Sequence, residues 1–494
     1  MMKAQRESIE KLRQTIEQLQ QTIAEKDEQI GLLNRMLFGK KSERFVSVDR
    51  QVKKKRKKDP EKAAEDKAKA DAERKQNKEI KKALPEETVE HPVSAEQCQC
   101  PICGGTEFKP MGFEESVQYE YVPSRFKKIV HRRAQQVCAC GQHIVIGPAP
   151  VRVSEGVMYG PGMHAHAVVS KCLDSLPFYR LAKQFLRAGI PLSRSAICDM
   201  FHRAAELLAP IYQRMQELIP LETYVNADET RIMVQNDEKT RTAYMWVFVA
   251  GVFRLYVFSA NRSGKTPVQV LGKSTGILQV DQWSAYNAVT TPKTRERAGC
   301  MGHARRKFFE AKGASPELAE TVITKIRDLY EVEYDAAAEK ILGTEKHLLL
   351  RKLRSKPIIE DLIEQLEKES PNHLPKSSTG KAIKYFIKNK KALQLFLKDP
   401  KIPLDNNISE RHLRLIALGR KNYLFVGNDT AGQNLAILQT VVATCVANNV
   451  DPQKYLTDVL IRIQTHPQSR LDELLPNNWK PPNDCAVESE SSGS

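Results

Sequence analysis

The stretch between residues 222 and 281 constrains the fold of this 494-residue chain more than any other. Residues 224–230, 243–250, 255–259 and 276–281 are short segments rich in apolar, β-branched and aromatic residues, which predicts four strands. The second segment is apolar throughout, as expected for a strand buried on both faces. A helical connection separates the third strand from the fourth, so this part of the chain is predicted to be an α/β domain.

Two acids, Asp228 and Asp281, lie on these strands among apolar neighbours. Strands in a sheet are about 4.8 Å apart, so carboxylates on neighbouring strands would repel each other unless a metal ion lies between them. A third acid, Glu410, follows Asp405 and Asn406, either of which is suited to cap a helix. The alternative is that Asp405 is only a cap and that the three acids are an accidental selection from 60 acidic residues.

Three such carboxylates match the requirement of a two-metal phosphodiester site. Two divalent ions about 3.5–4 Å apart activate a water or a 3′-hydroxyl and stabilise the leaving oxygen. Oxygen ligands and a phosphate substrate favour Mg²⁺, with Mn²⁺ tolerated. Glu229 alternates to the opposite strand face from Asp228, so it is expected to be a surface acid or to support the ligands from behind.

The charge balance indicates the class of partner. The chain has 77 Lys and Arg residues against 60 Asp and Glu residues, a formal net charge of +17. Such a surplus attracts polyanions, so nucleic acid is the first expected partner, an anionic membrane is the second, and a metabolic enzyme without a polyanionic partner is disfavoured. No run of eighteen apolar residues and no apolar signal core within residues 1–30 is present, so we expect a cytoplasmic protein with reduced cysteines.

Residues 1–45 carry apolar residues at alternating three- and four-residue steps. These are Ile9, Leu12, Ile16, Leu19, Ile23, Ile30, Leu33 and Leu37. The heptad pattern predicts a parallel two-stranded coiled coil and hence dimerisation, and the alternative is one amphipathic helix docked on its own protein. Residues 46–95 contain the basic run 53–58 and few large apolar residues, which indicates a linker that contacts DNA or only adds solubility.

Two close cysteine pairs lie within residues 96–150. The pairs are Cys100 with Cys103 and Cys138 with Cys140. Four thiolates from two short loops are the ligand set of a closed, tetrahedral structural zinc site, which has no open position for a substrate. Cys98 or His143 is an alternative for one ligand, and free thiols in a small β module are the simpler interpretation.

Residues 151–221 have a helical period. The pattern predicts a helix over 177–188, a turn over 189–192 and a second helix capped by Ser193. This arrangement suits a helix-turn-helix that presents Arg194 to a DNA groove, and an ordinary helical hairpin explains it equally well.

Nine stretches, in the same order along nearly the whole chain, resemble the transposases of the insertion sequence 66 (IS66) type. They are the coiled-coil start, CPICGG (100–105), SKCLDSLPFYR (170–180), ADET (227–230), DQWSAY (281–286), GCMGHARRKF (299–308), DNNISER (405–411), GRKNYLFV (419–426) and LLPNNW (474–479). The joint match is far more specific than any single motif.

The resemblance implies a retroviral-integrase-like RNase H fold with a DDE triad, which would be Asp228, Asp281 and Glu410 here. It implies cleavage of DNA at the ends of an insertion element and transfer of the 3′-hydroxyl ends into target DNA. The expected partners are the terminal inverted repeats, target DNA, further copies of the chain in a homodimer or larger assembly, and accessory proteins of the same element as candidates. The protein would be bacterial, cytoplasmic and nucleoid-associated when bound to DNA.

The resemblance also implies an order of parts. It is a coiled-coil helix (1–45), a basic linker (46–95), a zinc-binding module (96–150), a helical domain (151–221), the first part of the catalytic core (222–290), a helical insertion (291–402), the second part of the core with the third acid (403–450) and a C-terminal tail (451–494). The cofactors would be two Mg²⁺ ions and one structural Zn²⁺.

The sequence departs from the family pattern in two places. The second cysteine pair is Cys-x-Cys where Cys-x-x-Cys is common, and Gln282 stands where glycine is usual. Cys300 and His303 resemble the Cys-x-x-His found after the second acid in several transposase groups. They are half of a zinc site with His347 or His373 as partner, or, as we favour, they pack and hydrogen-bond locally.

Cations beside the proposed acids are candidate DNA contacts, which removes the membrane from the expected partners. Together with Arg194, the candidates are Arg305, Arg306, Arg411, Arg414, Arg420 and Lys421. Two other functions fit parts of the pattern. One is a zinc-containing DNA-binding regulator whose core is only a scaffold, and the other is a structure-specific nuclease that cuts DNA without joining it.

Overall fold

The computed structural model describes residues 126–137, 144–153, 158–236 and 239–481, together with a few single positions among the first 80 residues. The four proposed zinc ligands, the basic run and nearly all of the heptad pattern therefore lie outside the described residues. The sheet and the helices below belong to one compact unit, which includes residues 125–494.

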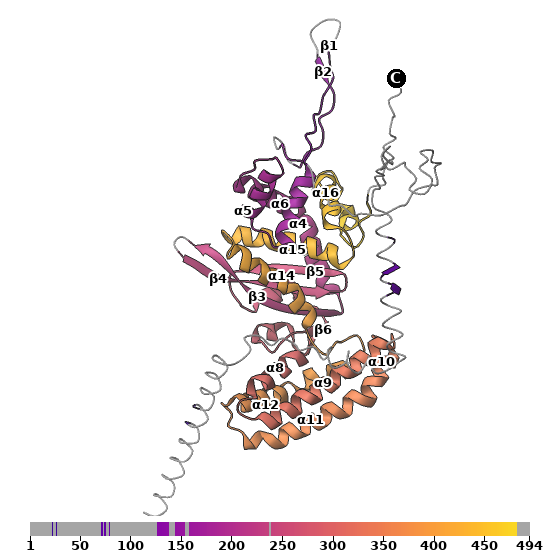
Figure 1. Cartoon of the computed structure of the whole chain (residues 1–494). Helices are drawn as coiled ribbons and strands as arrows, with labels where there is room; N and C mark the ends of the chain where they lie inside the picture. The colour runs from indigo at the N-terminus through magenta and orange to yellow at the C-terminus, as the bar shows by residue number, and fades with distance from the viewer. Residues whose placement is uncertain are drawn as a thin grey trace, which may run out of the picture. The chain divides into compact units, whose positions relative to one another are not determined.

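A mixed five-stranded sheet forms the centre of the unit (Figure 1). Its order is β5 (Phe253–Ser259), β4 (Lys239–Ala250), β3 (Tyr224–Asn236), β6 (Gly276–Gln279) and β7 (Arg295–Ala298). The first three strands are antiparallel, whereas β6 runs parallel to β3 and β7 parallel to β6. All four predicted strands are present, and the predicted helical connection is α7 (Lys265–Leu271).

The fifth strand was not expected, because β7 falls within the range 291–402 that was predicted to be helical. Its sequence, Arg-Glu-Arg-Ala, has no strand pattern, and the strand forms through tertiary contacts. Arg295 is 1% exposed, and its guanidinium donates to the carbonyls of Pro220, Glu222 and Ile277. Its Nε donates to the Ser274 hydroxyl at 2.9 Å, so a buried arginine whose donors are matched by three carbonyls and one hydroxyl fixes this edge of the sheet.

The helical insertion begins after β7 and has its own apolar core, which includes Phe308, Ile326 and Phe386. Its elements are α8 (Met301–Ala311), α9 (Pro316–Ala338), α10 (Glu345–Leu350), the π-helical η4 (Arg351–Ser355), α11 (Lys356–Glu369), η5 (Ser370–Asn372), α12 (Ser378–Lys388), α13 (Lys390–Leu393) and η6 (Leu395–Leu397). The chain then returns to the sheet through Asp405.

Two helices after the insertion pack against the sheet. Helix α14 (Asn407–Tyr423) contacts β3 and β4, and α15 (Asp429–Ala447) contacts β5 and α6 (Figure 1). Helix α15 is buried along most of its length, as its nearly continuous apolar sequence requires.

The segment predicted to be a C-terminal tail is folded as far as the described residues extend. Helix α16 (Pro452–Arg462) packs against α4, and η7 (Gln468–Leu474) follows it. The prediction was wrong because it overlooked an amphipathic pattern: Tyr455, Leu456 and Val459 share a buried face.

Among the described residues, the α-helices before the sheet are α4 (Pro161–Cys172), α5 (Phe178–Arg187) and α6 (Arg194–Leu218), with η2 (Ile219–Leu221) at the end. The predicted helix over 177–188 is α5, and the predicted cap is confirmed, since the Ser193 Oγ accepts a hydrogen bond from the Ala196 N–H. Before them lies a short antiparallel pair, β1 (Gln135–Val137) and β2 (Ile144–Ile146). Within the described residues, no helix is long and apolar enough to cross a membrane.

Candidate active site

The sheet and α14 bring the three predicted acids to one region. Asp228 lies on β3, Asp281 lies two residues beyond β6, and Glu410 lies in the first turn of α14. Asn226 is directly opposite Gln279 in the parallel β3–β6 register, so two residues further along each chain Asp228 and Asp281 come side by side. The prediction that two acids lie on neighbouring strands is therefore confirmed for the strands that lead to them.

The electrostatics of Asp228 show how close the acids are. Burial, followed by the charge of Glu229 and then by those of Asp281 and Glu410, raises the pKa of Asp228 to about 8. The Glu229 N–H donates to Asp228 Oδ1 at 2.8 Å and opposes this rise only in part. The acids interact without being packed together: across the described part of the chain, no three His, Cys, Asp or Glu side chains converge closely enough to hold a metal ion as they stand.

Beneath the acids, the buried side-chain amides of Asn226, Gln279 and Asn406 form a hydrogen-bonded network. We call it the amide network. The three residues are at most 2% exposed. The Asn226 Nδ2 donates to Asn406 Oδ1 at 2.9 Å and to Gln279 Oε1 at 3.3 Å. The Asn406 Nδ2 donates to the Ala227 carbonyl at 2.8 Å, and the Gln279 Nε2 to the Pro403 carbonyl at 2.8 Å. These bonds join β3, β6 and the start of α14.

The position of each amide in the sequence explains its effect on an acid. Asn226 precedes Asp228 by two residues on one strand, so both side chains share a face. Gln279 precedes Asp281 by two residues, and Asn406 precedes Glu410 by four, one helical turn. The amide network therefore fixes the backbone of all three acid-bearing segments. Sequence reasoning missed it, although a polar residue two positions before each strand acid was a usable signal.

Of the two expectations for Glu229, the surface position is wrong, because its side chain is only 2% exposed, and the position behind the acids remains. The Arg262 Nε donates to Glu229 Oε1 at 2.6 Å, and the Tyr286 hydroxyl donates to Glu229 Oε2 at 2.7 Å. Tyr286 is fully buried and meets Trp246 edge to face. Glu229 is thus a neutralised, immobile acid beside Asp228, and Arg262 is a site residue that sequence reasoning missed.

Asp405 has more partners than a helix cap requires. It accepts hydrogen bonds from the Asn407 N–H at 3.0 Å and, at 2.6 Å, from the hydroxyl of Tyr330 on α9. Cys300 is buried and its Sγ accepts a hydrogen bond from the Asn406 N–H at 3.3 Å, which agrees with the favoured interpretation of local packing and hydrogen bonding. His303 interacts electrostatically with the nearby acids, and burial lowers its pKa.

The two histidines considered as distant zinc partners have other neighbours. His347 lies 3.3 Å from Glu333, and His373 lies 3.5 Å from Glu369. Both carboxylates belong to the helical insertion, so the structure supplies these histidines with partners away from the proposed acids.

The candidate DNA contacts differ in their surroundings. Arg306 lies beside the acids, with its guanidinium 3.8 Å from Glu410. Arg420 is half-buried and donates to the Arg231 carbonyl, so its guanidinium is partly committed to β3. Arg305 is half-buried on α8. The remaining candidates are exposed: Arg194, Arg411, Arg414 and Lys421.

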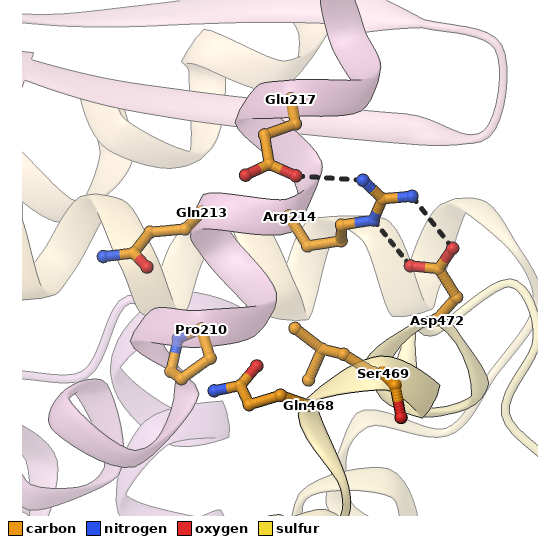
Figure 2. Close-up of a pocket in the computed structure, with 8 residues that line it drawn as sticks. Pro210, Gln213, Arg214, Glu217, Gln468, Ser469 and Asp472 are labelled. Atoms are coloured by element: carbon orange, nitrogen blue, oxygen red, sulfur yellow. Dashed lines mark hydrogen bonds and ion pairs between the residues drawn. The ribbon is translucent and has the colours of Figure 1, made fainter.

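A separate polar pocket lies between α6 and η7 (Figure 2). Its most prominent side chain, Arg214, donates to both carboxylate oxygens of Asp472, at 2.6 and 3.0 Å, and to Glu217 at 2.9 Å. With its cation paired on both sides, the pocket joins the C-terminal segment to α6 and contains none of the predicted site residues.

Comparisons with known families identify the class of protein. Residues 156–434 match the family described as "Transposase IS66 family", which is more than half of the chain. Residues 440–477 match "IS66 C-terminal element", residues 97–141 match "zinc-finger binding domain of transposase IS66", and residues 27–89 match "Transposase C of IS166 homeodomain". The class is therefore that of transposases, DNA-binding enzymes that cleave and join DNA.

Within that class, the chain belongs to the IS66 family of transposases. It is 32% identical to "Uncharacterized protein y4hP" of Sinorhizobium fredii, over 77% of this chain and 73% of that protein. It is 31% identical to "Uncharacterized protein y4jD" of the same organism, over 78% and 79% of the two chains. The zinc-finger match supports a structural zinc ion in the segment where the cysteine pairs lie.

Proposed function

We propose that this IS66 transposase is a DDE enzyme in which Asp228, Asp281 and Glu410 are the catalytic acids. It cleaves DNA at the ends of an insertion element and joins the 3′-hydroxyl ends to target DNA. The observation that carries the proposal is the placement of the three acids on three segments joined by the amide network, with the Asp228 pKa raised by burial and by the other acids. Three partly buried carboxylates that raise one another's cost of ionisation are stabilised when a cation offsets their charge.

The sheet supports an RNase H-like core. An antiparallel hairpin and a third strand, followed by two parallel strands, place the ends of adjacent central strands together, as a carboxylate site requires. The helical insertion between β7 and α14 brings the third acid back to β3 from more than 100 residues away.

The residues present fit divalent cations. Their ligand atoms are carboxylate oxygens, which suit Mg²⁺ and Mn²⁺. The pKa of Asp228 is raised first by burial and then by the neighbouring acids, and a nearby cation would offset both effects. When bound, two Mg²⁺ ions supply Lewis acidity to the attacking and leaving oxygens of an in-line displacement. The chain itself orients the acids through the amide network and neutralises Glu229 through Arg262, so that Glu229 does not compete for the cations.

The surrounding parts complete the proposal. Cys100, Cys103, Cys138 and Cys140 hold the structural zinc ion, and the N-terminal heptads join two copies of the chain. The exposed cations Arg194, Arg411, Arg414 and Lys421, together with Arg305 and Arg306, contact DNA phosphates. Arg420 acts mainly by joining α14 to β3, as its bond to the Arg231 carbonyl indicates.

The test is single-turnover cleavage of a duplex that carries the terminal repeat found beside the gene. Asp228→Asn, Asp281→Asn and Glu410→Gln should each lose at least about 1,000-fold in rate while still binding the duplex. Glu296→Gln is the matched control, since Glu296 is an exposed acid on β7. Cleavage at the normal rate by a folded variant of any of the three acids would refute the triad. Cleavage by the natural chain without joined products would show that the protein is a nuclease and not a transposase of the proposed mechanism.

A further inference from the structure

An exposed tryptophan lies immediately beside the proposed acids. Trp283 is two residues after Asp281, and its backbone N–H donates to Asp281 Oδ1 at 2.9 Å. It is 37% exposed, which makes it the most exposed of the three tryptophans of the chain, because Trp246 is fully buried and Trp479 is half-buried. The backbone of Trp283 is therefore tied to a proposed catalytic carboxylate, while its indole stays partly open to solvent.

A fixed arginine supports the indole. The Arg262 guanidinium carbon lies 4.1 Å from the centre of the Trp283 ring, which is within cation–π distance. Arg262 is itself held by Glu229, whose other oxygen accepts from the buried Tyr286. A chain of contacts from the core of the sheet thus makes Trp283 a rigid plate at the surface.

The charge on this support is already balanced. Arg262 is paired with Glu229, so the plate offers an aromatic surface rather than a free cation. Flat aromatic surfaces that are exposed and rigid bind other flat rings, and every nucleobase has such a face. A phosphate would instead be attracted by the unpaired exposed cations of α14.

The short distance between Trp283 and Asp281 determines which nucleobase can contact the indole. Two residues of chain place the Cα atoms of Trp283 and Asp281 within about 7 Å of each other. Nucleotides are spaced about 3.4 Å along a duplex strand, so a base at this distance belongs to a nucleotide next to the phosphodiester at the acids. Inside the duplex its faces are covered by stacking, so it meets the indole only when it is unpaired.

We propose that Trp283, supported by Arg262, receives an unpaired nucleobase next to the phosphodiester that the acids cleave. This inference rests on the proposed function and deepens it by naming a nucleobase site. Trp283 then positions the strand through its base, while the acids act on its phosphate. Stacking of one base on an aromatic side chain supports an effect between about fivefold and about 100-fold on cleavage.

The direct test uses 2-aminopurine, whose emission is low when it is stacked and high when it is not. The full-length protein is bound, in buffer without Mg²⁺ or Mn²⁺, to the terminal-repeat duplex with 2-aminopurine at either nucleotide flanking the cleaved bond. We expect low emission with the natural chain and with Trp283→Phe, and emission several times higher with Trp283→Ala. Equal emission with all three proteins would overturn the inference, because the base then never leaves the duplex for the indole.

A second measurement separates stacking from a structural role. Trp283→Ala should slow cleavage of the normal duplex, and the loss should disappear when the flanking nucleotide is abasic, because no base remains to stack. An equal loss on both duplexes would overturn the inference. Phe309→Ala is the matched control, since Phe309 is 38% exposed, and it should behave as the natural chain does on both duplexes.

The outcomes also separate this inference from the proposed function. If Asp281→Asn abolishes cleavage and Trp283→Ala changes neither emission nor rate, the acids stand and the nucleobase site is wrong. If Trp283 gives the emission change while cleavage survives loss of the acids, the proposed catalytic triad is wrong.

Discussion

Two buried polar networks join distant parts of this molecule, and they differ in charge. In the helical insertion, Arg351 is 1% exposed and donates to both oxygens of Glu333, at 2.8 and 2.7 Å, and to the carbonyls of Phe396 and Asp399. Beneath the acids, the amide network joins its segments through neutral groups alone. Each network fixes segments that lie far apart in the sequence.

The difference follows from what lies next to each network. A buried ion pair costs desolvation and repays it only when all its donors and acceptors are matched, as they are around Arg351. Beside Asp228, an added cation would compete with metal ions and an added anion would increase a repulsion that is already large. Neutral amides supply rigid geometry there without changing the local charge.

The largest effect is expected in the insertion. Glu333→Ala leaves Arg351 buried without its carboxylate, so it should lower the free energy of unfolding by about 3–5 kcal/mol. Urea unfolding of the full-length chain measures this loss. The control is Glu364→Ala, which removes an exposed pair with Lys368 and should leave the free energy of unfolding nearly unchanged. Equal losses of stability in the two variants would show that the buried pair stabilises the fold no more than an exposed pair does.

The next effect is expected in the amide network. Asn406→Ala leaves the Asn226 amide and the Ala227 carbonyl short of partners, which should cost about 1–3 kcal/mol of stability. Because the acids then lose their alignment, cleavage per folded molecule should fall about 100-fold. Asn389 is the matched control, as a buried asparagine at the C-terminal cap of α12 that donates to the Tyr385 carbonyl. If Asn389→Ala lowers cleavage as much as Asn406→Ala does, the amide network has no positioning role.

A smaller effect follows from the raised pKa of Asp228, which lies at about 8 in the folded chain against 3.8 ordinarily. The carboxyl favours folding while it is protonated, so its contribution is fully present below about pH 4 and is lost as the pH rises towards 8. Without added Mg²⁺ or Mn²⁺, the melting temperature of Asp228→Asn minus that of the natural chain should therefore increase between pH 4 and pH 8 by on the order of 5 °C. A constant difference across this range would mean that Asp228 is not perturbed.

The smallest effect concerns the exposed cations, which should act on DNA rather than on geometry. Arg411→Ala with Arg414→Ala should leave stability unchanged and reduce the slope of log binding constant against log salt by about 2. Lys346→Ala with Lys352→Ala removes two exposed cations of the insertion and is the control. A change of slope in the control alone would place the DNA on the insertion instead.

The sequence predicted much of the fold and indicated three candidate acids, whose catalytic role stays a proposal, and it failed where tertiary contacts decide. Apolar segments and a serine cap predicted four strands and helix α6, because these signals are local. Strand β7 was missed because its pairing with β6 and the buried contacts of Arg295 leave no pattern in four residues. The fold of the segment after residue 451 was missed because its apolar face was not recognised.

The three acids could be predicted from the sequence pattern, whereas the residues that hold their neighbours in place could not. Asp228, Asp281 and Glu410 stand out as charges among apolar residues or in a family motif, and the structure brings their segments together. The partners of Glu229 could not be predicted, because Arg262 and Tyr286 reach it from separate parts of the chain. Nor could the bond between Tyr330 and Asp405, which joins the insertion to the helix of the third acid.

Direct cation binding tests the central claim that the three acids are one metal site held by neutral amides. Calorimetric titration of the full-length chain with Mn²⁺ at pH 7.5 should show binding that releases protons, since Asp228 is largely protonated below about pH 8. Asp228→Asn, Asp281→Asn and Glu410→Gln should each weaken it at least about tenfold, and Asp228→Asn should also abolish the proton release. Unchanged affinity and unchanged proton release in all three variants would contradict the account.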